Sequence, residues 1–503
     1  HTHVLVANVV RGVDGRWSAP DSRRLHHYAC TAGYLYQAHL RHALTTRLGL
    51  RWRPVVKGSA ELEGFADPVL RAFSRRRADI KAELAERGAT SRKAAQIATL
   101  ATRQPKDSDE DVVSLRDEWV ERARDLGLHG EDLRSLLWCQ SAPGPLAIDE
   151  RDLTEALTAD SSTFDRRDVL RAIASRAGSG ATVADVEGCT DELLTGRSVV
   201  GLMDDRYTTP AMLALEHAVI QNALGRRRDR TGTAGDDIVD HVLHTRLTLS
   251  NEQAGMVRHL TTSGWGVDVV AGVAGAGKTR ALKAARVAWE ASGHRVVGVA
   301  LAARAAAELQ AGSGIPSGTL DALLLDLDRQ PDGLPARTVV VLDEAAMVGT
   351  RKLARLLTHA DAARAKVVLV GDDKQLPEIE AGGAFAGLAR RLPAVRLTEN
   401  LRQQDQVERE ALAELRAGEV AGALDRLAIH RRISYATDRP TLLDRMIDDW
   451  QQARSTGQDV LMLALRRVDV ESLNRAARQA LREHGELGSE TLDAPGRDFA
   501  VGD

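Results

Sequence analysis

The pattern of apolar and polar positions changes at about residue 246. From there on, short Val- and Leu-rich runs alternate with stretches of helical periodicity. The runs that we expect to form strands are residues 267–271, 296–300, 338–342, 366–370 and 460–465. Apolar runs of this length between helices are typical of parallel strands that helices cover on both faces. The second half of the chain is therefore predicted to be α/β, with a doubly wound parallel sheet.

Before residue 246 helical periodicity dominates. Residues 1–10 predict a strand, and a mixed helical stretch follows it. Residues 61–135 are charged and helical, with an amphipathic run that starts at residue 73. Pro and Gly at residues 141–145 then mark a boundary. We expect an α+β region at the start of the chain and a helical region after the boundary.

The stretch between the boundary and the α/β region contains two further signals. The polar residues 162–165 precede an apolar pair as a helix cap does. Residues 226–235 are polar and rich in Arg and Gly, which predicts a flexible loop or linker. The chain divides into four predicted regions, namely residues 1–135, 146–245, 246–405 and 406–503.

Length and charge restrict the possible functions. A chain of 503 residues holds several domains, because single cores rarely exceed about 250–300 residues. The net charge of −3 argues against a protein that coats nucleic acid with its whole surface. Residues 1–60 differ, since nine Lys and Arg against two Asp give this segment a net charge of +7. Charge alone fits a solvated basic face and a phosphate-binding surface equally well.

The cysteines and the chain ends add two expectations. Cys30, Cys139 and Cys189 are scattered and show no C-x-x-C spacing, which favours a reducing compartment, the cytoplasm, over a disulfide frame or a zinc site. No apolar run approaches the roughly 18–20 residues of a membrane span. The chain starts with His rather than Met, and we expect it to be part of a longer protein.

The strongest local signal is the segment Gly272-Val-Ala-Gly-Ala-Gly-Lys-Thr279, which matches the G-x-x-x-x-G-K-[ST] loop. It lies between a predicted strand and a predicted helix, as this motif requires. Gly272, Gly275 and Gly277 allow backbone amides to approach a polyanion without a Cβ in the way. Lys278 can reach the β- and γ-phosphates, and the Thr279 hydroxyl can ligate Mg²⁺. We predict a nucleotide site, although the loop alone leaves kinase, GTPase and transport ATPase open.

Polar residues at the ends of later strands narrow this prediction. Asp343 and Glu344 follow the run 338–342, where parallel sheets bring such residues to the phosphate loop. Asp343 is expected to hold Mg²⁺, and Glu344 to orient or deprotonate the attacking water. Gln375, after the next strand, is suited to sensing a γ-phosphate. Arg402 is a cation suited to transition-state charge.

These segments resemble superfamily 1 DNA helicases of the RecD-like branch. Asp343-Glu-Ala, Gly371-Asp-Asp-Lys-Gln-Leu-Pro and Glu399-Asn-Leu-Arg-Gln are similar to motifs II, III and IV of that family. The resemblance implies an ATP-driven motor whose first RecA-like lobe is residues 246–405. Residues 460–474 resemble the start of the second lobe.

The same resemblance assigns roles to residues outside these motifs. Leu249-Ser-Asn-Glu-Gln253 resembles the Q motif, which implies that Gln253 reads adenine. Arg304 and Thr319 lie where the family contacts single-stranded DNA, although Ala302-Ala-Arg304 departs from the usual Pro-Thr-Gly wording. The family's later motifs, which include a second catalytic Arg, have no counterpart before Asp503. We therefore expect this chain to bind ATP better than it hydrolyses it.

Two histidines open the chain on a predicted strand. His1 and His3 are two residues apart, which places both imidazoles on one face, and such a pair can share a divalent metal. His-x-His in a strand is more often incidental. The chain nevertheless resembles MobF-type conjugative relaxases, which are TrwC/TraI-like, in the segment His-Thr-His-Val-Leu-Val-Ala-Asn, in Trp17 and in the Phe73-Ser-Arg-Arg-Arg stretch.

That resemblance implies a three-histidine metal site and nucleophilic tyrosines. His1 and His3 match the second and third ligands, and the first ligand and the tyrosines are expected upstream of residue 1. Tyr28, Tyr34 and Tyr36 are interpreted as packing residues instead. Residues 1–135 are then the rear part of a relaxase domain.

Together the patterns predict a relaxase–helicase that nicks plasmid DNA at a transfer origin and unwinds it with ATP. The expected partners are single- and double-stranded DNA and other conjugation proteins. One alternative is a RecD-like repair helicase with an unrelated front domain. Another is a truncated remnant that only binds nucleotide and single strands.

Overall fold

The computed structural model describes residues 7, 9–19, 22–74, 80, 112–140, 142–245, 248–330, 332–375, 380–488, 490–494 and 497–502. The chain divides into two units, each made of two segments. The first unit combines residues 1–61 with residues 138–426, and the second combines residues 62–137 with residues 427–503. Each unit is described by itself below.

A six-stranded sheet is the centre of the first unit. Its strand order is β11-β6-β10-β9-β7-β8, and neighbouring strands are parallel. The strands are β6 (Val267–Gly272), β7 (Arg295–Ala300), β8 (Ser317–Thr319), β9 (Thr338–Leu342), β10 (Lys366–Gly371) and β11 (Val395–Leu397). Four of the predicted runs are thus confirmed as strands. The short strands β8 and β11 were not predicted, because Ser317-Gly-Thr and Val395-Arg-Leu are too short and too polar to stand out.

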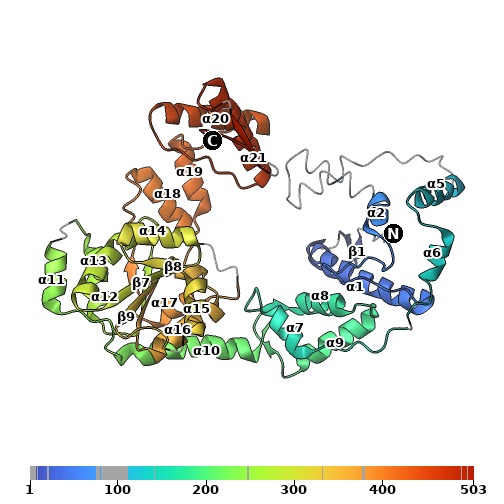
Figure 1. The fold of residues 1–503 in the computed structure, drawn as a ribbon, viewed down its shortest axis with the longest axis horizontal. Coiled ribbons are helices and arrows are strands. Elements are labelled where there is room, and N and C mark those ends of the chain that lie inside the picture. Colours follow the sequence, from blue (N-terminus) through green and yellow to red (C-terminus); the bar gives the residue numbers. More distant parts are fainter. Residues whose placement is uncertain are drawn as a thin grey trace. The chain divides into compact units, whose positions relative to one another are not determined.

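Helices cover both faces of this sheet (Figure 1). One face buries strand residues such as Val340 and Leu342 among the helices α15, α16 and α17, and the other buries Val339 and Val341 among α12, α13 and α14. The helices are α12 (Asn251–Thr262), α13 (Lys278–Ala291), α14 (Ala303–Ser313), α15 (Leu320–Arg329), α16 (Thr350–Ala362) and α17 (Ala384–Arg391). Alternate residues of one apolar strand therefore serve two cores, which explains the continuous apolar runs. The predicted doubly wound α/β fold is confirmed.

The segment before the sheet belongs to the same cores. Helix α10 (Pro210–Gly225) contributes Val219 and Ala223 to one core, and α11 (Asp236–His244) contributes Val239 and Val242 to the other. Between α10 and α11 the chain forms the short helix η1 (Arg226–Arg228) and the loop that follows it.

Residues 226–235 were predicted to be a flexible loop or linker, and the structure shows η1 followed by a loop that distant groups hold in place. Arg226 is buried and donates a hydrogen bond to the carbonyl of Ala365. The indole N–H of Trp289 donates to the carbonyl of Gly232 (2.8 Å), and the Ala234 N–H donates to Thr261 (2.7 Å). The loop was predicted correctly, but its flexibility was not, because composition shows that the segment is polar and not that distant groups satisfy its backbone.

The remaining part of the first unit is a small helical core. Arg41 of α1 is buried there and donates to the carbonyls of Gly58, Ala174 and Ala177. The capping prediction is confirmed, since Asp165 accepts from the N–H groups of Arg167 and Asp168 at the start of α8. The elements are β1 (Val10–Arg11), β2 (Trp17–Ser18), α1 (Ser22–Leu48), α7 (Glu150–Leu157), β3 (Phe164–Asp165), α8 (Arg166–Arg176), α9 (Val183–Thr195), β4 (Val200–Gly201) and β5 (Arg206–Thr208).

The three tyrosines of α1 do not behave alike. Tyr34 packs against the helical core, as predicted. Tyr28 and Tyr36 are 47% and 41% exposed, so their interpretation as packing residues was wrong. The guanidinium of Arg167 lies over the Tyr28 ring, 5.6 Å from its centroid. A long helix that packs on one side exposes some of its aromatic residues, and the local sequence does not show which.

The second unit contains helices and a two-stranded antiparallel sheet. Its elements are α2 (Asp67–Ala72), α5 (Val112–Asp125), α6 (Gly130–Ser135), α20 (Arg439–Ser455), α21 (Arg467–Glu483), β12 (Thr491–Ala494) and β13 (Arg497–Ala500). The run 460–465 was predicted to be a strand, and the structure assigns none there. Met462 packs against the core of α20 and α21, whereas Leu461 and Leu463 are exposed. A strand needs a partner for its ladder, and β12 and β13 of this unit pair with each other.

Two helices, α18 (Gln406–Ala417) and α19 (Val420–Ile429), follow the sheet of the first unit in the sequence. Across the described part of the chain, the search for a helix long and apolar enough to cross a membrane finds none.

Candidate nucleotide site

The phosphate loop joins the end of β6 to the start of α13. Gly275 and Gly277 have φ angles of +83° and +75°, a left-handed conformation that favours glycine. A Cβ at Gly277 would lie 2.2 Å from Nε2 of Gln253, and one at Gly275 would lie 2.6 Å from Cβ of Arg402. Both glycines are therefore required by backbone conformation and by the closeness of neighbouring segments.

Lys278 and Thr279 begin the helix that follows the loop. The Lys278 ammonium donates a hydrogen bond of 2.8 Å to the carbonyl of Gly272, so its side chain folds back over the loop. The amino-terminal end of a helix favours anions, because its N–H groups and its dipole point towards them. A cavity of about 540 Å³ opens beside this end and is lined by Thr248, Leu249, Gly277, Thr279, Arg280, Lys283 and Gly312. Its cations and helix end suit a phosphorylated ligand.

Asp343 and Glu344 lie where β9 ends, as predicted. The Asp343 N–H donates to the carbonyl of Val299 (2.9 Å), which ties the acid to the neighbouring strand β7. Glu344 takes a left-handed conformation with φ of +51°, and its N–H donates to Oδ1 of Asp343 (2.9 Å). Among the residues that the structure describes, neither carboxylate has an ion-pair partner within 4.0 Å.

The surroundings change the protonation of both acids. Burial raises the pKa of Asp343, although the Glu344 N–H and the charge of Lys278 oppose the shift. Burial also raises the pKa of Glu344, and the negative charge of Asp343 adds to the effect. Lys278 thus acts electrostatically on both acids. Buried oxygen ligands of this kind suit Mg²⁺, and a carboxylate with a raised pKa suits a general base.

The turn after β10 carries the predicted sensor. Gln375 is exposed, and its N–H donates to the carbonyl of Asp372. Asp372 itself is buried and binds the guanidinium of Arg416 from α18 through both carboxylate oxygens, at 2.7 and 2.8 Å. No local pattern pointed to Arg416, because its contact partner is 44 positions away in the sequence.

The segment that carries Arg402 lies against the phosphate loop. Strand β11 pairs with β6, and the Val273 N–H donates to the carbonyl of Leu397 (3.0 Å). Further on, the Leu401 N–H donates to the carbonyl of Gly275 (3.1 Å). Arg402 is exposed at this position. The structure therefore brings the predicted arginine next to the loop, although the two are more than a hundred residues apart in the sequence.

The start of α12 holds these two segments together. The Gln253 amide donates to the carbonyl of Ala276 (2.9 Å) and accepts from the N–H of Ser250 (3.1 Å), and its side chain is buried. Its neighbour Glu252 accepts from the N–H and the hydroxyl of Thr398, at 2.7 and 2.6 Å. Gln253 thus fixes the phosphate loop, and its contact with adenine stays a prediction. Glu252 was missed, although it stands inside the helix cap that drew attention to Gln253.

The predicted DNA contacts follow β7 and end β8, at the carboxyl ends of these strands. Arg304 is exposed on α14 and forms an ion pair of 3.0 Å with Glu308. Thr319 caps α15, and its hydroxyl accepts a hydrogen bond from the Ala322 N–H (3.2 Å). Both positions suit a strand that crosses this edge of the sheet, but their contact with DNA stays a prediction.

The predicted relaxase metal site cannot be compared with the structure, since His1 and His3 lie outside the described residues. Elsewhere, the described ranges hold no group of three His, Cys, Asp or Glu residues placed to bind a metal ion.

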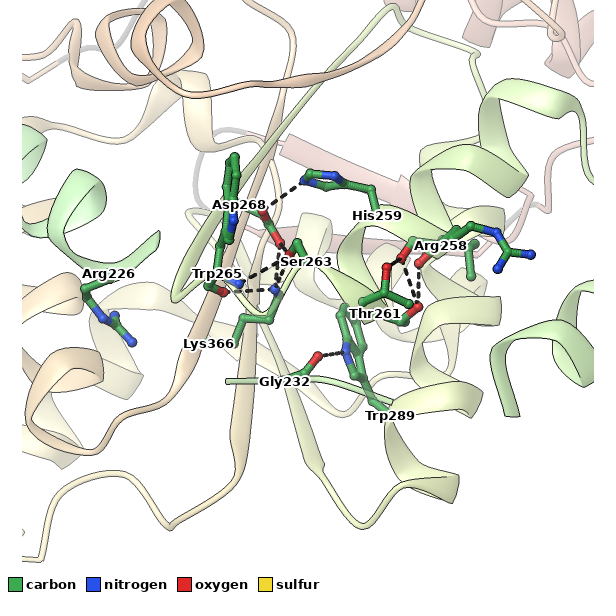
Figure 2. A network of polar contacts seen from close by, with 12 residues as sticks. Arg226, Gly232, Arg258, His259, Thr261, Ser263, Trp265, Asp268, Trp289 and Lys366 are labelled. Carbon is green, nitrogen blue, oxygen red and sulfur yellow. Dashed lines mark hydrogen bonds and ion pairs between the residues drawn. The ribbon is translucent and has the colours of Figure 1, made fainter. Parts of the chain in front are cut away.

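A second buried polar cluster lies at the opposite end of the sheet, where β6 and β10 begin (Figure 2). Asp268 and Lys366 are both fully buried and form an ion pair of 2.6 Å. The ammonium also donates to the hydroxyl of Ser263 (3.1 Å) and to the carbonyl of Trp265 (2.9 Å). His259 lies 3.1 Å from the other oxygen of Asp268. The buried charges of Asp268 and Lys366 are thus both paired with protein groups, as is typical of a structural network.

Two protein families match separate parts of the chain. The family described as TrwC relaxase matches residues 1–126, and the family described as AAA domain matches residues 248–438. The first match contains His1 and His3, and the second contains the phosphate loop, both acids and Arg402. The order of the two matches agrees with the resemblances found in the sequence.

Curated relatives support the same two parts. Conjugal transfer protein TraA of Rhizobium radiobacter is 34% identical over 346 residues, which are 66% of this chain and 31% of that protein. The protein of the same name from Agrobacterium fabrum is 34% identical over 342 residues, or 65% of this chain and 31% of that protein. The ATP-dependent RecD2 DNA helicase of Deinococcus radiodurans is 33% identical over 177 residues, or 34% of this chain and 24% of that protein. The chain thus spans about a third of the length of the TraA relatives.

Solved structures of the conjugative relaxase TrwC also match. The complex with oriT DNA in its metal-bound form is 29% identical and covers 24% of this chain and 43% of that chain. Its TM-score is 0.22, and we draw no structural conclusion from it.

Proposed function

The chain joins a TrwC relaxase segment to an AAA domain related to the RecD2 helicase, and from this premise we propose that it acts in conjugative DNA transfer. The relaxase part would belong to a domain that nicks plasmid DNA at a transfer origin. The AAA domain would use ATP to unwind the nicked strand. Single- and double-stranded DNA would be its partners, with other conjugation proteins.

One observation supports the motor function most directly. The phosphate loop, the paired acids and the Arg402 segment come from three distant parts of the chain and meet at one edge of the sheet. Backbone hydrogen bonds fix the arginine segment to Gly275, and the charge of Lys278 acts on both acids. An ATPase that transfers a phosphoryl group to water needs this set of groups in one place.

Each group has a role in the proposed reaction. Lys278 and the loop amides would hold the β- and γ-phosphates, while Thr279 and Asp343 provide the oxygen ligands for Mg²⁺. The Mg²⁺ ion would neutralise charge on the phosphate oxygens. Glu344 would orient the attacking water and accept its proton, a task that its raised pKa favours. Arg402 would stabilise the charge that develops as the γ-phosphate leaves.

The relaxase part rests on the family match and the sequence. His1 and His3 would share a divalent metal that polarises one DNA phosphate. The match of residues 1–126 to the TrwC relaxase family speaks against the alternative of a repair helicase with an unrelated front domain.

The motor proposal is tested by coupling between nucleotide and DNA. A labelled single-stranded oligonucleotide is titrated with the chain, with and without a non-hydrolysable ATP analogue and Mg²⁺. We expect the analogue to change DNA affinity several-fold for the wild type and not for the Lys278→Ala variant. An unchanged DNA affinity in the wild type would contradict the proposal.

ATP turnover separates the remaining alternative, a remnant that only binds nucleotide and single strands. Hydrolysis by this chain is measured with and without single-stranded DNA, against Lys278→Ala as the background. Turnover above this background that single-stranded DNA stimulates would exclude the remnant. Turnover no higher than that of Lys278→Ala would favour it.

A further inference from the structure

Asp372 is a buried acid that the proposed chemistry does not use. Its side chain has no exposed surface, and it lies at the start of the turn that carries Gln375. Arg416 binds both of its oxygens, and the Lys374 N–H donates to Oδ1 (3.1 Å). The bidentate pair is the strongest arrangement available to a carboxylate and a guanidinium. Asp372 thus fixes one end of the turn.

A second bond fixes the other side of the turn to the same helix. The Lys374 ammonium donates to the carbonyl of Arg416 (2.7 Å), which belongs to the last turn of α18. The carboxyl-terminal end of a helix favours a cation, so this bond is also electrostatically favourable. Two separate contacts, one through the Arg416 side chain and one through the Lys374 side chain, therefore join this turn to α18. The turn cannot move relative to α18 without breaking both bonds.

The charge of Lys278, the lysine of the phosphate loop, also acts on Asp372 in this turn. Burial acts to raise the pKa of Asp372, but the hydrogen bonds from Arg416 and Lys374 outweigh it, and the charge of Lys278 adds to them, so the pKa lies below its ordinary value. The pKa of Asp372 thus shifts in the opposite direction to those of the two acids at the end of β9. A stable negative charge keeps Arg416 bound at the pH at which the motor would work.

We propose that Arg416 is a positioning residue, which holds the turn of residues 372–375 so that the Gln375 amide can detect a γ-phosphate. The inference rests on the proposed ATPase function and extends it to a residue on α18. Arg416 does not touch the nucleotide in this account. It acts through Asp372, and its loss would free the sensor turn without changing the phosphate loop.

The helix that carries Arg416 is itself held in place by a separate set of ion pairs. Arg426 of α19 binds Glu410 (2.6 Å) and Glu414 (2.5 Å), both on α18. These pairs fix α18 to α19 but do not touch Asp372. Arg426 is exposed to nearly the same degree as Arg416, at 33% against 30% of the side chain. Arg426→Ala is therefore a matched control for the loss of an arginine ion pair at α18.

The test is a comparison of affinities for ADP and for a non-hydrolysable ATP analogue, each with Mg²⁺. The wild type is expected to prefer the analogue through its γ-phosphate. Arg416→Ala should reduce this preference by about five- to tenfold, the size of one typical lost hydrogen bond, with ADP affinity unchanged. Arg416→Lys should keep part of the preference, since lysine preserves the charge but not the bidentate contact. Arg426→Ala should leave it as in the wild type.

A double variant separates positioning from general damage. Gln375→Ala should cause the same loss as Arg416→Ala, and the two together should cause no more than either alone, because both act on one contact. Arg416→Ala combined with Asp372→Asn guards against misfolding, since no buried charge is then left unpaired. Additive losses, or an equal loss of ADP and analogue affinity in Arg416→Ala, would overturn the inference.

The proposed function can fail separately from this inference. If Lys278→Ala leaves nucleotide affinity unchanged, the nucleotide site itself is wrong. If Lys278→Ala abolishes binding and Arg416→Ala changes nothing, only the role of Arg416 is wrong.

Discussion

The two ends of the six-stranded sheet differ in whether their charged side chains have ion-pair partners. Where β6 and β10 begin, Asp268 and Lys366 are fully buried, and each has several protein partners. Where β6 and β9 end, Asp343 and Glu344 are half-buried, and the described residues offer them no ion pair within 4.0 Å. The same sheet therefore carries one charge cluster that is satisfied internally and one that is left to bind something else.

The protonation of the acids follows this difference. Burial acts to raise the pKa of Asp268, but hydrogen bonding to His259 and the charge of Lys366 outweigh it, so the pKa falls below its ordinary value. At the other end burial prevails, and the pKa values of Asp343 and Glu344 rise. Removing one partner of a buried ion pair is costly, whereas a half-buried acid without an ion-pair partner is itself unfavourable for folding and is typical of functional sites.

The largest expected effect is at the paired end. Asp268→Ala leaves the Lys366 ammonium buried without its partner, and we expect the free energy of unfolding to fall by about 3–5 kcal/mol. Urea unfolding of purified protein measures this change. Asp240→Ala, which breaks the exposed pair with Arg258, should cost no more than about 1 kcal/mol. Similar losses in both variants would contradict the assignment of Asp268 to a structural network.

The opposite sign is expected at the unpaired end. Asp343→Asn removes a charge that burial disfavours, and we expect the free energy of unfolding at neutral pH to rise by about 0.5–2 kcal/mol. The same variant should weaken the Mg²⁺-dependent part of nucleotide binding, because an amide is a poorer ligand than a carboxylate. A marked loss of stability in Asp343→Asn would show that this acid has a structural partner.

The smallest expected effect is the pH dependence of these changes in the free energy of unfolding. A raised pKa means that the folded protein takes up a proton before the unfolded chain does, so the penalty of Asp343 is present at neutral pH and disappears as pH falls through the raised value. The gain from Asp343→Asn should shrink accordingly. A lowered pKa has the opposite sign, and the contribution of Asp268 is lost only as pH falls below the ordinary Asp range of about 3.9. Unfolding at several pH values between about 2.5 and 7 measures both trends, and equal trends would contradict the contrast.

Local patterns predicted the strands and the chemistry of the unpaired end. The strands β6, β7, β9 and β10 are continuous apolar runs, and the phosphate loop and the acids stand directly at their ends. Features of this kind can be recognised from residues that are neighbours in the sequence. The sheet's topology then brings them together, as it does in any parallel sheet.

Contacts between distant residues could not be predicted. Arg416 and Glu252 stand in ordinary charged helices, and their partners are 44 and 146 positions away. Trp289 and Gly232, which help to fix the loop that was predicted to be flexible, are 57 positions apart. The prediction of a strand at residues 460–465 was wrong for a related reason, since a strand depends on a partner strand that its own sequence does not reveal.

We propose that the unpaired end binds a nucleoside triphosphate. Titration of the chain with a fluorescent ATP analogue and Mg²⁺ tests this most directly, with Lys278→Ala as the variant and Lys352→Ala as the control; Lys352 is half-buried on α16 and pairs with Asp321 and Glu380. Since Lys278 would provide the ammonium for the phosphates, we expect its loss to reduce affinity by roughly 100-fold, or about 2.7 kcal/mol, while Lys352→Ala binds as the wild type does. Equal affinity in all three proteins would contradict the account.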